Sequence, residues 1–344
     1  MGLEVAVVGV GRWGKNHVRV LAELKGKIVD RLVIVDSNIA RAREIAEKYP
    51  ADAIYSSVED LTAKEKNLDA AIIAVPTAYH YKIASYLLDF YNLFIEKPLA
   101  SSIEEGFDLV KKSVREEKIV AVGHIERFNP IVNIALKTVK EMGEVLEITA
   151  KRLGPGPASN YTLNLGVAHD LLVHDVDIAR LFAGTLPWGV FAHTSYSPSF
   201  PYEIEISAQY LFDKDPSAFL VASWRTTPKY KHRSFSIRLE NAIIHVDYIL
   251  RRIIIDTGLE IHKFGNEKKA VVHSEKTGIE ISYLQEEPLR LELEDFLMSI
   301  IEHRKPTVDI IDGYIALKCI EKALESAKKK KLVEISWDEL DKVR

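Results

Sequence analysis

Cysteine is almost absent from this sequence, and its absence removes several classes of protein. The 344 residues contain one cysteine, Cys319, so no internal disulfide can form and thiolate-rich metal sites are excluded. We interpret Cys319 as a small buried residue on a helix. The sequence therefore predicts neither a disulfide-stapled scaffold nor a zinc module, and we expect no bound metal ion.

Excess charge and long apolar runs are also missing. The formal net charge is −4, which provides no basic footprint for nucleic acid or for an anionic membrane. No uninterrupted apolar run reaches the length of a membrane span. Because the first apolar run lies at the N-terminus, we expect no signal peptide. We expect a cytoplasmic protein whose partners are small molecules and further copies of the chain.

What remains is an ordinary globular composition, with 47% apolar and 28% charged residues. A chain of this length exceeds one ordinary core and predicts two domains. Glutamine occurs only at Gln209 and Gln285, whereas Lys, Glu and Ile are plentiful. That mixture is typical of a heat-adapted source.

The first turn of the chain carries a dinucleotide-binding pattern. A short apolar strand, residues 5–8, ends in Gly9-x-Gly11-x-x-Gly14, and a helical pattern follows over residues 13–24. Gly9 allows the tight turn, Gly11 allows a pyrophosphate to approach the backbone, and Gly14 allows helix and strand to pack closely. The helix N-terminus offers N–H groups to phosphates. Asp36 closes the next strand, at the place where an acid accepts hydrogen bonds from the ribose.

Apolar strands alternate with helices as far as residue 124, which predicts a parallel sheet. The predicted strands are 5–8, 31–35, 53–55, 68–75, 93–95 and 119–123, and the predicted helices are 13–24, 39–48, 79–90 (with Thr77 as its N-cap) and 103–116 (capped by Ser101 or Ser102). The carboxyl ends of parallel strands share one edge, where ligands bind. That edge carries the glycine turn, Pro76-Thr77, Glu96-Lys97-Pro98 and residues 124–130.

Strand periodicity prevails after residue 125. Strands are predicted at 145–151, 190–196, 203–212, 218–224, 234–240, 243–248, 252–256, 269–273 and 332–335, and helices at 132–141, 170–182, 289–302 and 313–328. Consecutive strands with short turns predict an antiparallel sheet. The strict alternation of polar and apolar residues over 203–208 predicts that one face of this strand is exposed to water or packs against another element. We divide the chain into residues 1–124, a dinucleotide-binding domain, and residues 125–344, a substrate and oligomerisation domain. The C-terminal helices can pack back on the first domain.

Lys97 is the first candidate catalytic residue. It follows an apolar strand and precedes Pro98, which fixes the backbone. A partly desolvated lysine can hold, polarise or deprotonate a substrate hydroxyl. The alternative is a surface ion pair between Glu96 and Lys97. The strand-end position favours the catalytic interpretation.

Asp170 and His174 form the second candidate group. They are spaced i and i+4 on a predicted helix and therefore share one face. A carboxylate that orients an imidazole is a common acid–base arrangement, and the ordinary histidine pKa of about 6.5 suits proton exchange. A shared divalent ion is disfavoured, because no HExxH motif is present and thiolates are nearly absent. A capped helix with surface acids remains open from this segment alone.

Several motifs together resemble the Gfo/Idh/MocA oxidoreductase family. They are Gly9-x-Gly11-x-x-Gly14, Val75-Pro76-Thr77-x-x-His80, Glu96-Lys97-Pro98-Leu99-Ala100, Asp170-x-x-x-His174-Asp175-x-Asp177, and the closing segments around residues 287–296 and 306–313. The resemblance implies an α/β protein: a Rossmann domain followed by an α/β domain with an open, mainly antiparallel sheet. It also implies a homodimer or homotetramer joined through that sheet. A second copy of the chain would bury the apolar face that the sheet otherwise exposes to water.

The resemblance implies roles for individual residues. Lys97, Asp170 and His174 occupy the family's catalytic positions. The residues matching the cofactor site are Gly9, Gly11, Arg12, Trp13, Gly14, Asp36, Val75, Pro76, Thr77, His80, Glu96 and Lys97. Asp36 favours NAD, because a carboxylate repels the 2′-phosphate of NADP. Ser37, Asn38, Arg41 and Arg43 leave room for NADP, although we interpret the two arginines as a solvated helix face.

The segment His124-Ile-Glu126-Arg127-Phe-Asn129-Pro130 is similar to that of UDP-N-acetylglucosamine 3-dehydrogenase-like members of the family. His124, Glu126, Arg127 and Asn129 are therefore candidate substrate contacts, as are Lys97, Asp170 and His174. Arg152 is a further candidate, which could meet a diphosphate.

The predicted activity is NAD-dependent oxidation of a secondary sugar hydroxyl, with the 3-hydroxyl of UDP-N-acetylglucosamine as first choice. Two other classes stay open. One is a dehydrogenase of an inositol, a free hexose or a dihydrodiol, including one that recycles its cofactor. The other is a non-catalytic NAD-binding sensor or assembly subunit, which the intact Lys97, Asp170 and His174 disfavour.

Overall fold

The chain divides into two compact units in the computed structural model. The structure describes residues 2–156, 165–213, 216–227, 229–256, 270–275, 278–283 and 286–343. Unit 1 comprises Met1–Ile125, Glu287–Leu317 and Glu339–Arg344, and unit 2 comprises Glu126–Glu286 and Lys318–Asp338. The chain thus leaves unit 1 after Ile125 and again after Leu317, and it returns each time with a C-terminal segment.

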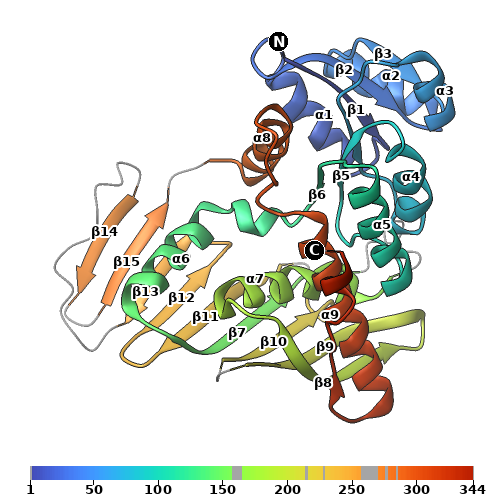
Figure 1. The fold of residues 1–344 in the computed structure, drawn as a ribbon. Coiled ribbons are helices and arrows are strands. Elements are labelled where there is room, and N and C mark those ends of the chain that lie inside the picture. Colours follow the sequence, from blue (N-terminus) through green and yellow to red (C-terminus); the bar gives the residue numbers. More distant parts are fainter. Residues whose placement is uncertain are drawn as a thin grey trace. The chain divides into compact units, whose positions relative to one another are not determined.

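Unit 1 is built on a parallel sheet. Its strands are β1 (Leu3–Val8), β2 (Val29–Val35), β3 (Ala53–Tyr55), β4 (Ala70–Ile73), β5 (Asn92–Ile95) and β6 (Val120–Val122), in the spatial order β3-β2-β1-β4-β5-β6 (Figure 1). Every strand pair in this sheet is parallel. The order reverses between β1 and β4, so the loops after these two strands flank the crevice where such sheets bind ligands. The predicted Rossmann domain is confirmed.

The helices of unit 1 largely follow the predicted pattern. They are α1 (Gly14–Glu23), α2 (Ile39–Lys48), α3 (Val58–Lys64), α4 (His80–Leu87), α5 (Ile103–Arg115) and α8 (Pro288–Ile301). Ser102 caps α5 by accepting a bond from the N–H of Glu105 at 3.2 Å. The sequence did not predict α3, whose single apolar residue in the core, Leu61, gives too weak a period.

The predicted N-cap at Thr77 is wrong. Pro76 occupies the cap position of a short 3₁₀ helix, Thr77–Tyr79, and its carbonyl accepts the N–H of Tyr79 at 2.9 Å. Helix α4 begins only at His80. The proline in extended conformation starts a tight turn before the helix can form, so Thr77 is inside the turn rather than at a cap.

Helix α8 joins the core of unit 1 although it lies far along the chain. Leu293, Phe296 and Leu297 are buried in the same apolar cluster as β1 and α1. The ring of Phe296 meets that of Phe94 on β5 edge-on, with centroids 5.8 Å apart. Apolar burial of this kind is the main stabilising term for the unit.

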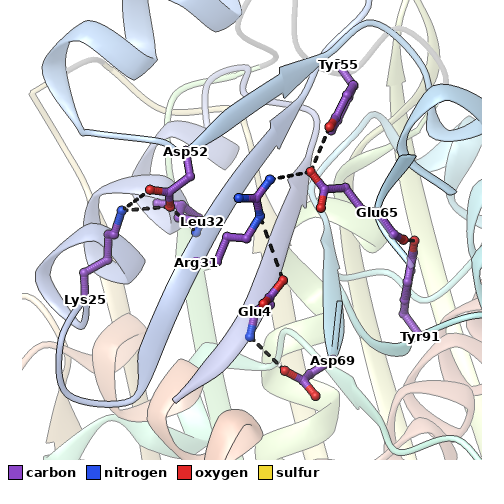
Figure 2. A network of polar contacts seen from close by, with 9 residues as sticks. All are labelled: Glu4, Lys25, Arg31, Leu32, Asp52, Tyr55, Glu65, Asp69 and Tyr91. Atoms are coloured by element: carbon purple, nitrogen blue, oxygen red, sulfur yellow. Dashed lines mark hydrogen bonds and ion pairs between the residues drawn. The ribbon is translucent and has the colours of Figure 1, made fainter. Parts of the chain in front are cut away.

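Charged side chains connect neighbouring strands and loops near the amino-terminal edge of the parallel sheet, which is opposite the ligand edge (Figure 2). Arg31 of β2 donates to Glu65 at 2.6 Å, and the same carboxylate accepts the hydroxyl of Tyr55 at 2.7 Å. Asp52 bonds both Lys25 and the backbone N–H of Leu32. Networks of this type contribute more than isolated surface pairs.

Replacing Glu65 by glutamine is expected to lower the free energy of unfolding by about 1 kcal/mol at neutral pH. Burial opposes the charge of Glu65, but the bonds from Arg31 and Tyr55 keep its pKa below the ordinary value. The stabilisation is therefore present above the ordinary carboxyl pKa of about 4 and is lost as pH falls through the lower folded-state value.

The measurement is urea unfolding of the wild type and the Glu65→Gln variant between neutral and acid pH. Glu44→Gln, at an exposed position of α2, is the matched control and should leave stability within a few tenths of a kcal/mol. A stability difference that stays constant down to strongly acid pH would contradict the role given to the Glu65 carboxylate.

Unit 2 is built on a second sheet, which is mainly antiparallel as predicted. Its spatial order is β14-β15-β13-β12-β11-β7-β10-β9-β8-β16. The strands are β7 (Val145–Leu153), β8 (Pro187–Ser197), β9 (Phe200–Phe212), β10 (Ser217–Ser223), β11 (His232–Leu239), β12 (Ile243–Asp247), β13 (Arg252–Asp256), β14 (Ala270–Glu275), β15 (Gly278–Tyr283) and β16 (Val333–Glu334). Among the described strands of this sheet, β7 and β10 are the only pair that runs parallel. Strand β15 was not predicted, and residue 269 of the predicted 269–273 strand lies outside the described residues.

Helices α6 (Pro130–Met142), α7 (Val173–Ala183) and the second half of α9 (Ile310–Lys329) cover one face of this sheet (Figure 1). Trp188, Phe191 and Phe219 are exposed large apolar side chains on β8 and β10. Phe191 and Phe219 each pair in register with Gln209 of β9, so Phe191, Phe219 and Gln209 share one face of the sheet.

Strand β9 departs from the predicted alternation. Its register with β8 shifts near Tyr196, and Glu203 is buried although Ile206, Ala208 and Tyr210 also face inward. The shift inserts an extra residue, as a β-bulge does. The Glu203 carboxylate thereby accepts the N–H of Ala168 at 3.0 Å.

Candidate functional site

The glycine turn after β1 has the shape that a dinucleotide requires. Gly9 has φ +87°, in the left-handed region, and a Cβ on Gly14 would lie 1.8 Å from the carbonyl oxygen of Gly9. A Cβ on Gly11 would meet no atom within 4 Å. Gly9 and Gly14 are thus required by the backbone itself, whereas the open space at Gly11 leaves the backbone accessible to a pyrophosphate. The turn fits NAD.

Asp36 at the end of β2 accepts several hydrogen bonds. The donors are the backbone N–H groups of Val10 and Asn38, both at 2.8 Å, and the side chain of Arg41, whose Nη2 lies 2.8 Å from Oδ1. Arg41 is exposed, as expected for a solvated helix face, and its guanidinium also pairs with Asp36. The bonds from Val10 and Asn38 fix the carboxylate next to the glycine turn, where it can accept ribose hydroxyls.

Glu96 links the glycine turn to the loop after β5. Its carboxylate accepts bonds from the indole of Trp13 and from Nε2 of His17, the latter at 2.7 Å, and the N–H of Lys97 lies 3.3 Å from Oε2. Glu96 is thus bonded to the glycine-turn segment rather than extended into solvent as half of a surface pair. The half-buried Lys97 is placed by this arrangement directly after a buried carboxylate.

His80 connects the loops after β4 and β5. Its Nε2 lies 2.9 Å from the carbonyl oxygen of Val75 and its Nδ1 lies 2.9 Å from that of Pro98. Burial lowers the pKa of His80, although both carbonyl contacts oppose this effect. The structure therefore gives His80 a positioning role: it ties the Val75-Pro76-Thr77 loop to the cis Lys97–Pro98 peptide.

Asp170 and His174 lie in one helical stretch of unit 2, but that stretch is not uniform. Residues Ala168–Leu172 form a π-helical turn, and α7 starts at Val173. Wide turns of this kind occur at functional sites. The indole Nε1 of Trp224 lies 3.3 Å from Oδ2 of Asp170. The neighbouring His169 points its Nε2 at Glu321, 2.7 Å away.

Three of the predicted substrate contacts, Glu126, Arg127 and Arg152, take part in internal ion pairs. The Arg127 Nε donates to Asp177 at 2.7 Å, with both side chains buried. The Arg152 side chain is 1% exposed and donates to Asp175 at 2.8 Å and to Glu126 at 2.8 Å. Burial opposes the charge of Arg152, but the two carboxylates raise its pKa above the ordinary value. These bonds engage the Arg152 guanidinium within unit 2, and its contact with a diphosphate stays a prediction.

The other predicted substrate contacts are placed as follows. Asn129 caps α6, with its side-chain oxygen 3.4 Å from the N–H of Ile131, and its amide lies 3.2 Å from Glu126. His124 is buried in unit 1. Lys97 belongs to unit 1, whereas Asp170, His174 and the remaining candidates belong to unit 2.

Replacing Arg152 by methionine is expected to destabilise unit 2 by about 3–5 kcal/mol, because the buried Asp175 and the half-buried Glu126 would lose their cationic partner. Thermal unfolding of the full chain measures this loss. Arg238→Met, which removes an exposed arginine 3.4 Å from Glu147 on the same sheet, is the control and should change stability by less than about 1 kcal/mol. An Arg152→Met variant as stable as the wild type would show that the pair contributes little.

Sequence reasoning missed several residues that lie next to the Asp170 segment or to Arg152. Trp224, Glu203, Arg233 and Tyr248 come from four different strands or strand ends, and no local spacing connects them with the helix that carries Asp170. In the sequence, the one indication for Glu203 was an acidic residue at an alternating position of a predicted strand.

Among the described residues, no group of three or more His, Cys, Asp or Glu side chains is arranged to hold a metal ion. No helix within the described ranges is long and apolar enough to cross a membrane.

A Rossmann domain with a complete glycine turn, joined to a unit with a mainly antiparallel sheet, defines a class of NAD-dependent oxidoreductases. Residues 3–124 match the sequence model of the Gfo/Idh/MocA oxidoreductase family with its NAD-binding Rossmann fold, and residues 136–245 match the family's C-terminal domain. The chain belongs to the Gfo/Idh/MocA family, whose curated relatives include named dehydrogenases, and its cofactor is NAD.

Curated relatives with different substrates match the chain about equally well. UDP-N-acetylglucosamine 3-dehydrogenase of Acidithiobacillus ferrooxidans is 29% identical over 194 residues, 55% of this chain and 57% of that protein. Inositol 2-dehydrogenase of Mycolicibacterium smegmatis is 31% identical over 186 residues, 52% of each chain. The chain therefore spans about half the length of these relatives in the alignments.

Solved structures share the whole fold. A structure of the Acidithiobacillus ferrooxidans UDP-N-acetylglucosamine 3-dehydrogenase has a TM-score of 0.82 at 24% identity, covering 96% of this chain and 99% of that one. Levoglucosan dehydrogenase in complex with NADH and levoglucosan has a TM-score of 0.87 at 20% identity, covering 98% and 100%. At these identities the likeness shows the fold alone.

Proposed function

We propose that this enzyme uses NAD to oxidise a secondary hydroxyl of a sugar, and that the substrate is UDP-N-acetylglucosamine, oxidised at its 3-hydroxyl. The observation that carries the proposal is the Asp170–His174 segment, in which Trp224 holds the Asp170 carboxylate four residues before the imidazole of His174. A fixed carboxylate beside a histidine suits proton transfer from a hydroxyl.

Three residues share the chemistry in this proposal. His174 removes the hydroxyl proton, Asp170 orients the imidazole, and Lys97 donates to the same oxygen and stabilises the negative charge that develops on it. NAD, when bound, supplies the acceptor for the hydride that leaves the carbon.

The cofactor contacts of the proposal lie at the carboxyl edge of the parallel sheet. They are Gly9, Gly11, Arg12, Trp13, Gly14, Asp36, Val75, Pro76, Thr77, Glu96 and Lys97, with His80 positioning two of the loops. The open backbone at Gly11 supports a pyrophosphate there, and the bonded carboxylate of Asp36 supports NAD over NADP.

The choice of a sugar nucleotide is supported by the sequence similarity to UDP-N-acetylglucosamine 3-dehydrogenase. His124, Glu126 and Asn129 remain the proposed polar contacts to the substrate. An inositol is the second candidate, because several curated inositol 2-dehydrogenases match the chain over nearly the same share of its length.

We also propose a homodimer or homotetramer. Phe191 and Phe219 are exposed on the face of the second sheet that the helices leave open, and Trp188 is exposed on β8. A second copy of the chain would remove this apolar surface from water. Sedimentation of the purified protein tests the assembly state, and a monomer at micromolar concentration would refute it.

Mass spectrometry of the purified protein incubated with NAD and UDP-N-acetylglucosamine tests the activity. The expected product is lighter than the substrate by one pair of hydrogen atoms, and Lys97→Ala should not form it. If this product is absent but myo-inositol yields NADH, the substrate is a polyol. If no sugar or polyol is oxidised while NAD binds, the chain is not an active dehydrogenase.

A further inference from the structure

A polar cluster in unit 2 contains two arginines on neighbouring strands. Arg152 of β7 and Arg233 of β11 are direct cross-strand neighbours, so their side chains leave the same face of the sheet. Arg152 is fully engaged by Asp175 and Glu126. The buried Nε of Arg233 has no hydrogen-bond partner among the described residues.

Tyr248 adds a second unused donor beside Arg233. Its backbone N–H donates to the carbonyl oxygen of Arg233 at 3.0 Å, and its ring lies under the Arg152 guanidinium, 5.2 Å from centroid to Cζ. The Tyr248 side chain is buried, and its hydroxyl has no hydrogen-bond partner within the part of the chain that the structure describes. Burial raises the pKa of Tyr248, so the hydroxyl keeps its proton and can donate.

A buried donor without a hydrogen-bond partner is unfavourable unless a ligand supplies one. Burial, and then the charge of Arg152, lower the pKa of Arg233, although the charges of Glu126, Asp175 and Asp170 oppose this shift. Arg233 also feels the charge of Asp170, so it lies in the neighbourhood of the proposed acid–base pair. Two unused donors together favour a ligand group that only accepts hydrogen bonds.

We propose that Arg233 and Tyr248 form a phosphate subsite that holds the substrate. The inference rests on the proposed function and names the part of the substrate that this unit recognises. A guanidinium matches phosphate oxygens in geometry and charge. In a glycosyl phosphate the phosphate and the ring hydroxyls are only a few bonds apart, so a subsite near Asp170 would orient the ring for oxidation. Arg233 takes the role predicted for Arg152.

Titration calorimetry of the full chain with UDP, and separately with inorganic pyrophosphate, tests the subsite. Arg233→Met should weaken UDP binding by about tenfold or more, the loss expected for one charged hydrogen-bonding partner. Arg238→Met, from the same strand but exposed and paired with Glu147, should stay within about twofold. Equal affinity of Arg233→Met and the wild type, or no binding of either probe by the wild type, would overturn the proposal.

Tyr248→Phe separates ligand binding from a structural role. It removes only a hydroxyl that lacks a partner, so the melting temperature should stay the same or rise, while UDP binding weakens about three- to tenfold. A lower melting temperature with unchanged UDP affinity would show that the cluster is structural and would overturn the subsite. If Arg233→Met does not fold, Arg233→Lys replaces it, with UDP binding expected to weaken several-fold because the planar fork is lost.

Two further measurements distinguish failure of the phosphate subsite from failure of the proposed function. Glucuronate replaces UDP in one titration: binding of glucuronate but not of UDP or pyrophosphate would overturn a phosphate subsite in favour of a carboxylate one. Turnover of a neutral polyol by a wild type that binds no phosphate would overturn the subsite and leave the dehydrogenase standing. UDP binding that depends on Arg233, without oxidation of any substrate, would support the subsite and overturn the proposed dehydrogenase activity.

Discussion

Replacing His174 by asparagine is expected to lower kcat by about 10²–10⁴, the range typical of general acid–base catalysis. The variant keeps a polar side chain but cannot take up the hydroxyl proton near neutral pH. Substrate KM and NAD affinity should change far less, because binding depends on other contacts. The measurement is steady-state NADH formation across pH, in which the ionisation of His174 in the wild-type profile should disappear.

His193→Asn is the matched control. His193 is exposed on β8, so its replacement should leave kcat and the pH profile unchanged. A His174→Asn enzyme that retains more than half of the wild-type kcat would contradict the assignment of the base. Asp170→Asn should show a smaller loss, since it disturbs only the orientation of the imidazole.

Replacing Lys97 by methionine is expected to lower kcat by about 10²–10³, the loss typical when one donor to a developing oxyanion is removed. The stem of the side chain is preserved, so the loop after β5 should keep its structure. NAD affinity, measured by calorimetry, should fall by no more than a few-fold, because the glycine turn and Asp36 are intact.

Lys82→Met, at an exposed position of α4, is the control for the loss of one positive charge. A parallel loss of kcat in both variants would indicate a general electrostatic effect rather than a role of Lys97. Lys97→Arg should recover only part of the activity, because a planar guanidinium cannot replace a compact ammonium at one oxygen.

The sequence predicted the parallel sheet well because its signals are local. The glycine spacing, the apolar strands and the capping Ser102 each act within one turn or strand. The short helix α3 and the turn at Pro76 escaped prediction, because few residues carry either signal and a proline can start a 3₁₀ turn or a helix equally well.

The candidate site was predictable only in part, because its partners are distant in sequence. Trp224 meets Asp170 across 54 positions, and Arg152 meets Asp175 across 23. The spacing of residues along the sequence does not indicate which arginine forms an ion pair with a buried carboxylate. Arg152 was therefore predicted to bind a ligand, whereas we propose this role for its cross-strand neighbour Arg233.

Transfer of deuterium from substrate to cofactor tests directly whether the 3-hydroxyl is oxidised. UDP-N-acetylglucosamine that carries deuterium on the carbon bearing the 3-hydroxyl is incubated with the enzyme and NAD, and both products are analysed by mass spectrometry. Our account predicts an unlabelled keto sugar and one deuterium in NADH. NADH formed without deuterium would contradict oxidation at that carbon, and failure to form NADH from this or any other sugar or polyol would contradict the dehydrogenase itself.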